Sequence, residues 1–84
     1  MTQPLVYGSD PPHGPEPGHE YRELTGGGPL DGQIIDVTGY TDEQRGFGAY
    51  LIADNTAYDP GGRAAYAPPD ADPTAPWEWE GDIP

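Results

Sequence analysis

The chain has 84 residues and a formal net charge of −12, because 15 carboxylates stand against three arginines and no lysine. This length suits one small domain, and so few basic residues argue against direct binding to nucleic acid phosphates or to an anionic membrane. The absence of cysteine excludes disulfides and thiolate metal sites. We find no segment typical of a signal peptide or a membrane span, so a cytoplasmically made soluble protein is expected.

Residues 1–19 are predicted to form an extended arm. They contain five prolines and three glycines, and proline removes backbone donors and fixes φ, so neither a helix nor a strand ladder is expected there. Only Leu5, Val6 and Tyr7 offer apolar anchors. Because the chain's own domain is expected to offer the arm little surface, our interpretation is that the arm lies on a neighbouring subunit. The alternative is a tail with no role.

Residues 20–84 are predicted to form a small β domain. The strongest strand signal is the β-branched run at residues 33–38, with Ile35 and Val37 on one face and Ile34 and Asp36 on the other. Further strands are expected at residues 20–24, 49–53 and 63–67. The glycine-rich residues 25–33 are predicted to be the hairpin turn between the first two strands, and residues 54–56 and 59–62 have turn chemistry as well.

A single helical turn is predicted at residues 40–45, because Thr41 is a suitable N-cap and acidic residues follow it. Residues 68–76 contain four prolines and are predicted to be a stiff connector. Residues 77–80 alternate strictly, which places Trp77 and Trp79 on one face of a final short strand.

These segments predict a mostly β fold, a small antiparallel sheet or partly open barrel of four to five short strands with an N-terminal arm. The expected core residues are Leu24, Leu30, Ile35, Val37, Leu51 or Ile52, Tyr66, Trp77 and Trp79.

Patterns of nucleotide and metal sites are incomplete. The glycines at residues 26–28 lack the Lys and the following helix of a phosphate-binding loop. Asp70 and Asp72 begin like a calcium loop, but the Gly and Glu that such a loop requires are missing. His13 and His19 lie in the arm without further ligands of a zinc site. No cofactor and no metal are expected.

No catalytic set is predicted. Asp36 is the one acid inside an apolar strand, where burial would raise its pKa, but it is expected to face solvent. Both histidines lie in the arm, so no Ser–His arrangement is expected. The sequence therefore favours a protein that is not an enzyme.

The aromatic residues are candidates for partner binding, because Trp and Tyr are favoured in protein interfaces. The predicted partner-binding residues are Leu5, Val6 and Tyr7 of the arm, together with Trp77 and Trp79. The alternative for the two tryptophans is that they complete a core that is short of aliphatic residues.

Residues 21–33, with the motif Tyr-Arg-Glu-Leu-Thr-Gly-Gly-Gly-Pro-Leu-Asp-Gly-Gln, resemble a pattern in small proteins of actinobacteria and their tailed phages. Residues 61–66 and 77–82 resemble further parts of that pattern. Most such proteins have no assigned activity, so the resemblance implies a phage or prophage setting more than a function. The arm is not part of the pattern.

The expected function is that of a structural interaction protein of a virion, either a capsid decoration protein or a minor capsid protein. Its partner would be a capsid or other virion subunit, it would be located in the virion, and a homo-oligomer is an open alternative. The second hypothesis is an acidic regulator that inhibits a nucleic-acid-binding protein by mimicking DNA charge.

Overall fold

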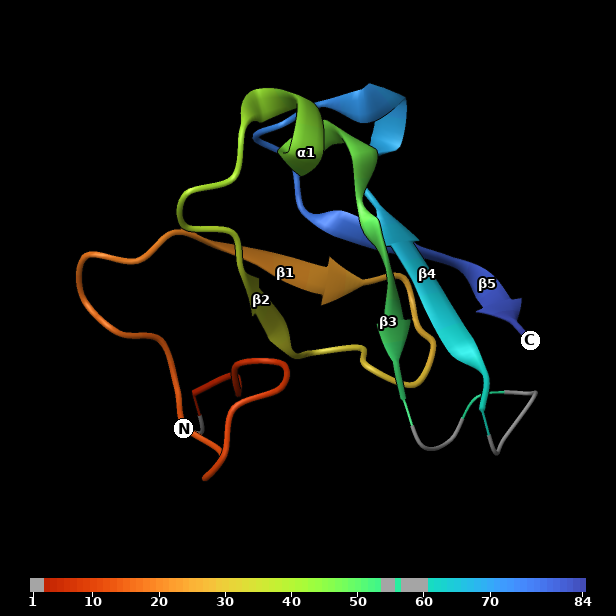
Figure 1. Cartoon of the computed structure of the whole chain (residues 1–84), viewed down its shortest axis with the longest axis horizontal. Helices are drawn as coiled ribbons and strands as arrows, with labels where there is room; N and C mark the ends of the chain where they lie inside the picture. The colour runs from red at the N-terminus through yellow and green to blue at the C-terminus, as the bar shows by residue number, and fades with distance from the viewer. Residues whose placement is uncertain (1–2, 54–55, 57–60) are drawn as a thin grey trace.

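A computed structural model of the chain describes residues 3–53, 56 and 61–84. Within these residues, five strands form a mixed sheet that curls into a half-barrel, which confirms the predicted mostly β fold (Figure 1). The elements in chain order are β1 (Tyr21–Thr25), β2 (Ile34–Asp36), α1 (Asp42–Phe47), β3 (Ala49–Ile52), β4 (Arg63–Ala67), the 3-10 helix η1 (Pro69–Ala71) and β5 (Trp77–Ile83). The predicted turns at 54–56 and 59–62 fall largely outside the described residues.

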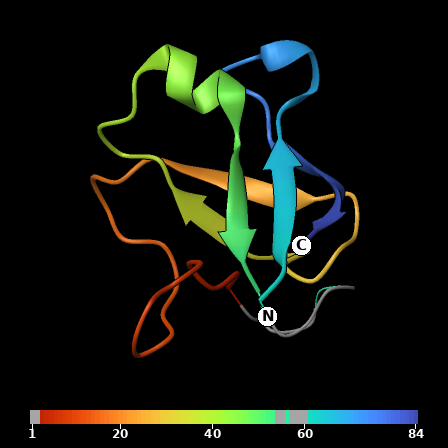
Figure 2. The same ribbon diagram turned by 45° about the vertical axis from the view of Figure 1, so that its right-hand side comes forward.

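The strand order in the sheet is β2-β1-β5-β4-β3. The pairs β1–β2, β3–β4 and β4–β5 are antiparallel, but β1 and β5 are parallel, with Leu24 opposite Trp77. Of the two predicted forms, the partly open barrel is the one observed, and its sheet is antiparallel except at the β1–β5 pair. In Figure 2, β3 and β4 stand in front of β1, so the curled sheet encloses the core between them.

The core follows the predicted residues closely. The buried cluster contains the predicted aliphatic residues and selects Leu51 over Ile52, which is 61% exposed. Val6, Ala64 and Ala65 are buried in addition to the predicted residues, and two further residues differ from the prediction. Trp79 is 37% exposed and so is not a full core residue, and Ile34 is buried although it lies on the face opposite the predicted core residues Ile35 and Val37. Ile34 is covered because Val6 of the arm pairs with it.

The helical turn is stabilised by a capping box. Gln44 donates its backbone amide to the Thr41 hydroxyl at 3.1 Å, and Thr41 donates its amide to the Gln44 side-chain oxygen at 2.9 Å. Thr41 was the predicted N-cap, and the helix ends where Gly48 adopts a φ of 78°. This φ favours glycine, and it turns the chain directly into β3.

The connector at residues 68–76 packs against the body. The Arg22 guanidinium donates from Nη2 to the Pro73 carbonyl oxygen at 2.7 Å and from Nε to the same oxygen at 3.1 Å. A Cβ on Gly46 of α1 would lie 2.5 Å from the Ala71 oxygen, so η1 and α1 are in close contact. These contacts hold β5 in place between β1 and β4.

Candidate interaction surface

The two tryptophans of β5 have different environments. Trp77 is completely buried, and its indole Nε1 donates to the Arg45 carbonyl oxygen at 3.2 Å. Trp79 lies at the rim of the half-barrel over Gly28, and its Nε1 donates to Asp82 Oδ1 at 3.0 Å. Trp77 is therefore a core residue in this structure, and only Trp79 presents surface to a partner.

The arm residues proposed to bind a partner also differ from one another. Val6 is only 9% exposed, whereas Leu5 is 46% exposed. Tyr7 is half-buried, and its hydroxyl accepts a hydrogen bond from the Ile52 amide at 2.8 Å. The idea that the chain's own domain offers the arm little surface is therefore wrong, because β2 and β3 both contact it. Of the three residues, Leu5 is the most accessible.

Among the large apolar side chains, the three most exposed lie on β3 and at the end of α1. Phe47, Tyr50 and Ile52 are 80%, 70% and 61% exposed. Successive side chains of a strand point to opposite faces, so Tyr50 and Ile52 lie on the outer face while Leu51 points to the core. We call these three residues the apolar strip. β3 is also an outermost strand of the sheet, and exposed edge strands are common sites of strand addition.

A shallow pocket of about 320 Å³ lies beside the apolar strip. Its lining residues are Phe47, Gly48, Ala49, Tyr50, Tyr66 and Glu80. Small-molecule sites occupy roughly 300–1,000 Å³ and contain several convergent polar groups. This pocket is at the lower limit of that range and offers a single carboxylate, so it suits one inserted side chain of a protein partner better than a cofactor.

The residues of the apolar strip were not among the five partner-binding residues predicted from the sequence. Residues 49–52 are all apolar, so the sequence does not show which face of this strand packs against the core. One signal was available. Phe47 stands between Gly46 and Gly48 at the end of a single helical turn, and so short a segment has little surface on which to bury a phenyl ring.

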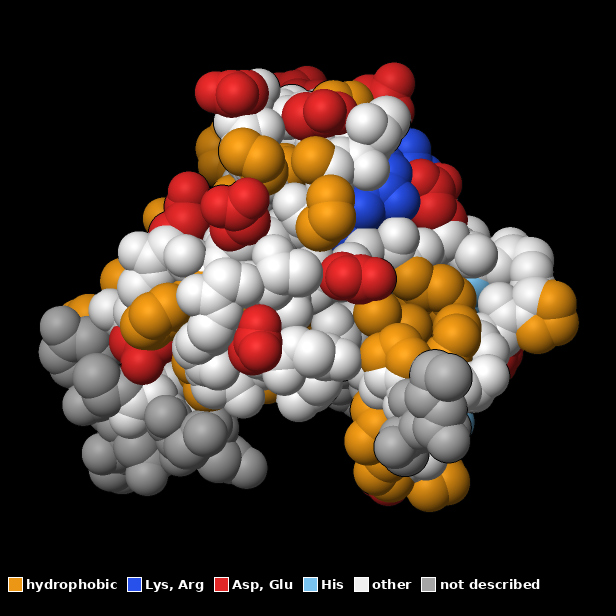
Figure 3. All heavy atoms as spheres, turned by 180° about the vertical axis from the view of Figure 1, so that it is seen from behind, with side chains coloured by type: hydrophobic (Ala, Val, Ile, Leu, Met, Phe, Trp, Pro, Cys, Tyr) orange, Lys and Arg blue, Asp and Glu red, His pale blue; other side chains and the backbone are white. Residues whose placement is uncertain are grey.

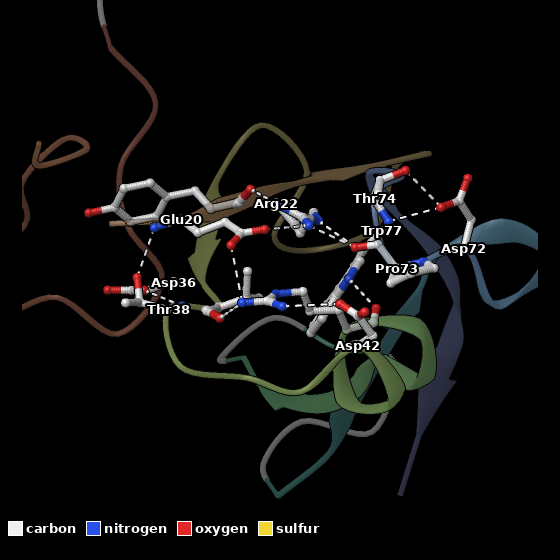
Figure 4. Close-up of polar contacts among 12 residues, drawn as sticks. Glu20, Arg22, Asp36, Thr38, Asp42, Asp72, Pro73, Thr74 and Trp77 are labelled. Atoms are coloured by element: carbon white, nitrogen blue, oxygen red, sulfur yellow. Dashed lines mark hydrogen bonds and ion pairs between the residues drawn. The ribbon is translucent and has the colours of Figure 1, made fainter. Parts of the chain in front are cut away.

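Two of the three arginines are used inside the molecule. Arg22 and Arg45 have side chains that are 11% and 16% exposed, and Glu20 joins them, with Oε2 at 2.7 Å from Arg22 and Oε1 at 3.1 Å from Arg45. Figure 4 shows Glu20 and Pro73 on either side of the Arg22 guanidinium. Arg45 also lies 3.3 Å from Asp42.

The outer surface is strongly acidic, because 13 carboxylates and one arginine lie outside these pairs. The third arginine, Arg63, donates to the carbonyl oxygens of Gly61 and Gly62. On the face in Figure 3, carboxylates are spread widely, while the basic atoms gather in one place beside acidic ones. Such a surface favours a basic partner and repels an acidic one.

The root of the arm carries a cluster of ionisable groups. The ring nitrogen Nδ1 of His19 lies 2.7 Å from Asp36 Oδ2, and Nε2 lies 3.8 Å from Glu16. The His19 ring also stacks on Tyr21, with ring centroids 6.0 Å apart. Asp36 faces solvent in part, as the sequence predicted, and it connects β2 to the arm.

These contacts shift both pKa values. The Thr38 hydroxyl and amide hold the pKa of the Asp36 carboxyl at about 2, below its usual 3.8, and His19 acts in the same direction. The hydrogen bond to Asp36 raises the pKa of His19 above its usual 6.5, and the charges of Asp36 and Glu16 add to this. The ion pair is therefore favoured in weakly acidic solution.

We expect the His19–Asp36 pair to make stability depend on pH. Since the pKa of His19 is raised, its contribution is full below pH 6.5 and is lost as the pH rises through the higher folded-state value. Since the pKa of Asp36 is lowered, its contribution is present above pH 3.8 and is lost as the pH falls towards about 2. His19→Gln should lower the melting temperature at pH 5.5 by no more than a few degrees, since exposed pairs are weak, and by less at pH 8.

His13→Gln is the matched control. His13 is also exposed and lies 3.6 Å from Glu16, but it makes no contact with Asp36 that would link the arm to β2. An equal difference between wild type and His19→Gln at both pH values would contradict the assignment of this pair.

The glycine-rich loop is hydrogen-bonded to the core, and its surroundings do not favour an anion. The Tyr66 hydroxyl donates to the Gly27 carbonyl oxygen at 2.9 Å and accepts from the Leu30 amide at 3.1 Å. The hollow next to this loop is lined in part by the carboxylates of Glu23 and Asp31, which repel phosphate. The loop therefore fixes the connection from β1 to β2.

Within residues 3–53, 56 and 61–84, no three His, Asp or Glu side chains lie close enough together to hold a metal ion. In the same part of the chain, no helix has the length and apolarity that crossing a membrane requires. Comparisons with protein-family models, with curated proteins and with solved structures found no match to this chain.

Proposed function

We propose that this chain is a non-enzymatic interaction protein that binds a basic protein surface through its apolar strip, Phe47, Tyr50 and Ile52. The observation that carries the proposal is the exposure of these three side chains, 80%, 70% and 61%, two of which, Phe47 and Tyr50, line one side-chain-sized pocket. Aromatic residues seated beside such a pocket are typical of the residues that dominate binding energy in interfaces.

The proposed setting is a virion, in which the chain is a decoration or minor capsid protein and the partner is a shell subunit. Support for this setting comes from the resemblance at residues 21–33 to small proteins of actinobacteria and their phages. The acidic surface and the apolar strip fit a protein that attaches to another protein.

The first test is whether the chain is present at fixed stoichiometry in purified particles of the phage or prophage that encodes it. The second is the affinity of the shell subunit for the chain. Tyr50→Ser should weaken binding by about 30-fold or more, because truncating a central aromatic residue in an interface costs about 2 kcal/mol. Its melting temperature should stay close to that of the wild type, since Tyr50 is exposed.

Leu5→Ser is the matched control, because Leu5 is an exposed apolar residue of the arm. It should leave affinity for the shell subunit within about twofold of the wild type, as is usual outside the central residues of an interface. A loss caused by Leu5→Ser and not by Tyr50→Ser would move the contact from the apolar strip to the arm. Absence of the chain from purified particles would remove the virion setting.

The alternative function is an acidic regulator of a nucleic-acid-binding protein. The charge balance favours it, because 15 carboxylates stand against three arginines, and two of those arginines are paired within the molecule with Glu20 and Asp42. Binding by charge mimicry should weaken steeply between 50 and 300 mM salt, whereas binding through the apolar strip should change little.

A further inference from the structure

The arm contacts both outermost strands of the half-barrel. On β2, the Ile34 amide donates to the Leu5 carbonyl oxygen at 3.0 Å, and the Tyr7 amide donates to the Ile34 carbonyl oxygen at 2.7 Å. On β3, the Ile52 amide donates to the Tyr7 hydroxyl at 2.8 Å. Because β2 and β3 are the two ends of the strand order, residues 5–7 close the seam of the half-barrel.

The segment that joins these three residues to β1 is folded on itself. Val6 donates its amide to the His13 carbonyl oxygen at 2.9 Å, and the Ser9 hydroxyl donates to the Val6 carbonyl oxygen at 2.7 Å. Gly8 and Gly18, at φ of 75° and 85°, stand at its two ends, and nothing lies within 4 Å of a Cβ built on either. Figure 1 shows this segment as a loop beside β2, away from α1.

The length of this segment is comparable to the size of the whole molecule. Residues 8–18 would span roughly 34 Å if extended at ~3.1 Å per residue. The longest dimension of the molecule is 35 Å. If the segment straightens, residues 5–7 can therefore reach the β2 edge of an adjacent copy.

We propose that residues 5–7 are an exchangeable strand, so that in closely packed copies the arm of one lies on the β2 edge of the next. The same contacts to Ile34 and Ile52 are made in both arrangements, which is the condition for low-cost exchange of a segment between identical chains. Residues 3–9 contain no charged side chain, so exchange adds no like charge at the contact between two strongly acidic molecules.

A second copy is the favoured occupant of this edge because it supplies the side chains that already fit there. Val6 is only 9% exposed against Ile34, and the Tyr7 hydroxyl reaches the Ile52 amide. An arm tethered to its own domain has an effective concentration in the millimolar range. The chain should therefore be a closed monomer when dilute and exchange only when copies are held together. This inference rests on the proposed function, because a virion surface would hold the copies close together.

Engineered thiols provide a direct test, because the chain contains no cysteine of its own. Val6→Cys and Ile34→Cys are mixed at about 1 mM and oxidised, and disulfide-linked products are identified by non-reducing electrophoresis and mass spectrometry. Because about 1 mM is close to the effective concentration of the tethered arm, on the order of tens of per cent of the chains should be exchanged. The mixed dimer should exceed by about tenfold the product of a control pair in which Thr74→Cys, on the connector, replaces Ile34→Cys.

The double variant Val6→Cys/Ile34→Cys checks the geometry in dilute solution, where it should form a disulfide within one chain and remain monomeric. A folded double variant without that disulfide would overturn the placement of the arm. If the disulfide forms but the mixed pair gives no more product than the control, exchange is ruled out. Both measurements use the free chain, so they are independent of whether it is found in particles.

Discussion

Replacing Trp77 by alanine is expected to unfold the domain at room temperature. Trp77 has no exposed surface, it lies opposite Leu24 in the parallel β1–β5 pair, and its indole donates to the Arg45 carbonyl oxygen of α1. Truncating a buried tryptophan costs about 3–5 kcal/mol, and the core of so small a domain is expected to supply a total of only about 3–5 kcal/mol. Circular dichroism and urea denaturation would measure the loss.

Trp79→Ala is the matched control, because the same side chain is removed from the same strand two residues away. Trp79 is 37% exposed, so its truncation should cost about 1–2 kcal/mol of the free energy of unfolding and leave a folded protein. If Trp79→Ala unfolds the chain while Trp77→Ala keeps the wild-type urea midpoint, the assignment of the two indoles to core and rim is reversed.

Local sequence signals were enough to predict where the elements lie. The strand at residues 63–67 has the predicted bounds, and Thr41 is the helix cap that its hydroxyl and the following acids indicated. These features depend on turn formers, β-branched residues and capping groups within a few positions, which is the range over which backbone preferences act.

The arrangement of the elements was harder to predict because it depends on distant contacts. The parallel neighbours Leu24 and Trp77 are more than 50 residues apart, and no local pattern records their pairing. Alternation placed Ile34 on the outer face of β2, but it did not show that Val6 covers that face.

The candidate surface illustrates the same limit. Trp77 and Trp79 lie two residues apart in one alternating segment and share Glu78 as a neighbour, yet Trp77 is buried and Trp79 lies at the rim. Tyr50 and Leu51 are both suited to a strand interior, and only the curvature of the sheet decides which faces the core. The residue types therefore suggested an interaction protein, but the position of the apolar strip could be found only from the fold.

Gly28→Ala is expected to destabilise the fold strongly. Gly28 has a φ of 80°, and a Cβ built on it would lie 2.6 Å from Cγ and Cδ1 of Trp79 and 2.7 Å from the Tyr66 hydroxyl oxygen. That hydroxyl bonds to the Leu30 amide and the Gly27 carbonyl oxygen, so displacing it leaves two backbone groups of the loop unpaired.

The expected cost of Gly28→Ala has two parts that a matched variant separates. A left-handed backbone costs an alanine roughly 1–2 kcal/mol, and overpacking against two rings costs about 1–3 kcal/mol more. Gly32→Ala carries the first cost alone, because Gly32 has a φ of 89° and nothing lies within 4 Å of its built Cβ. In urea denaturation, Gly28→Ala should therefore have the lower midpoint of the two. Equal midpoints would mean that the loop is not pressed against Trp79 and Tyr66, and the close contact between the glycine-rich turn and the rim of the half-barrel would have to be abandoned.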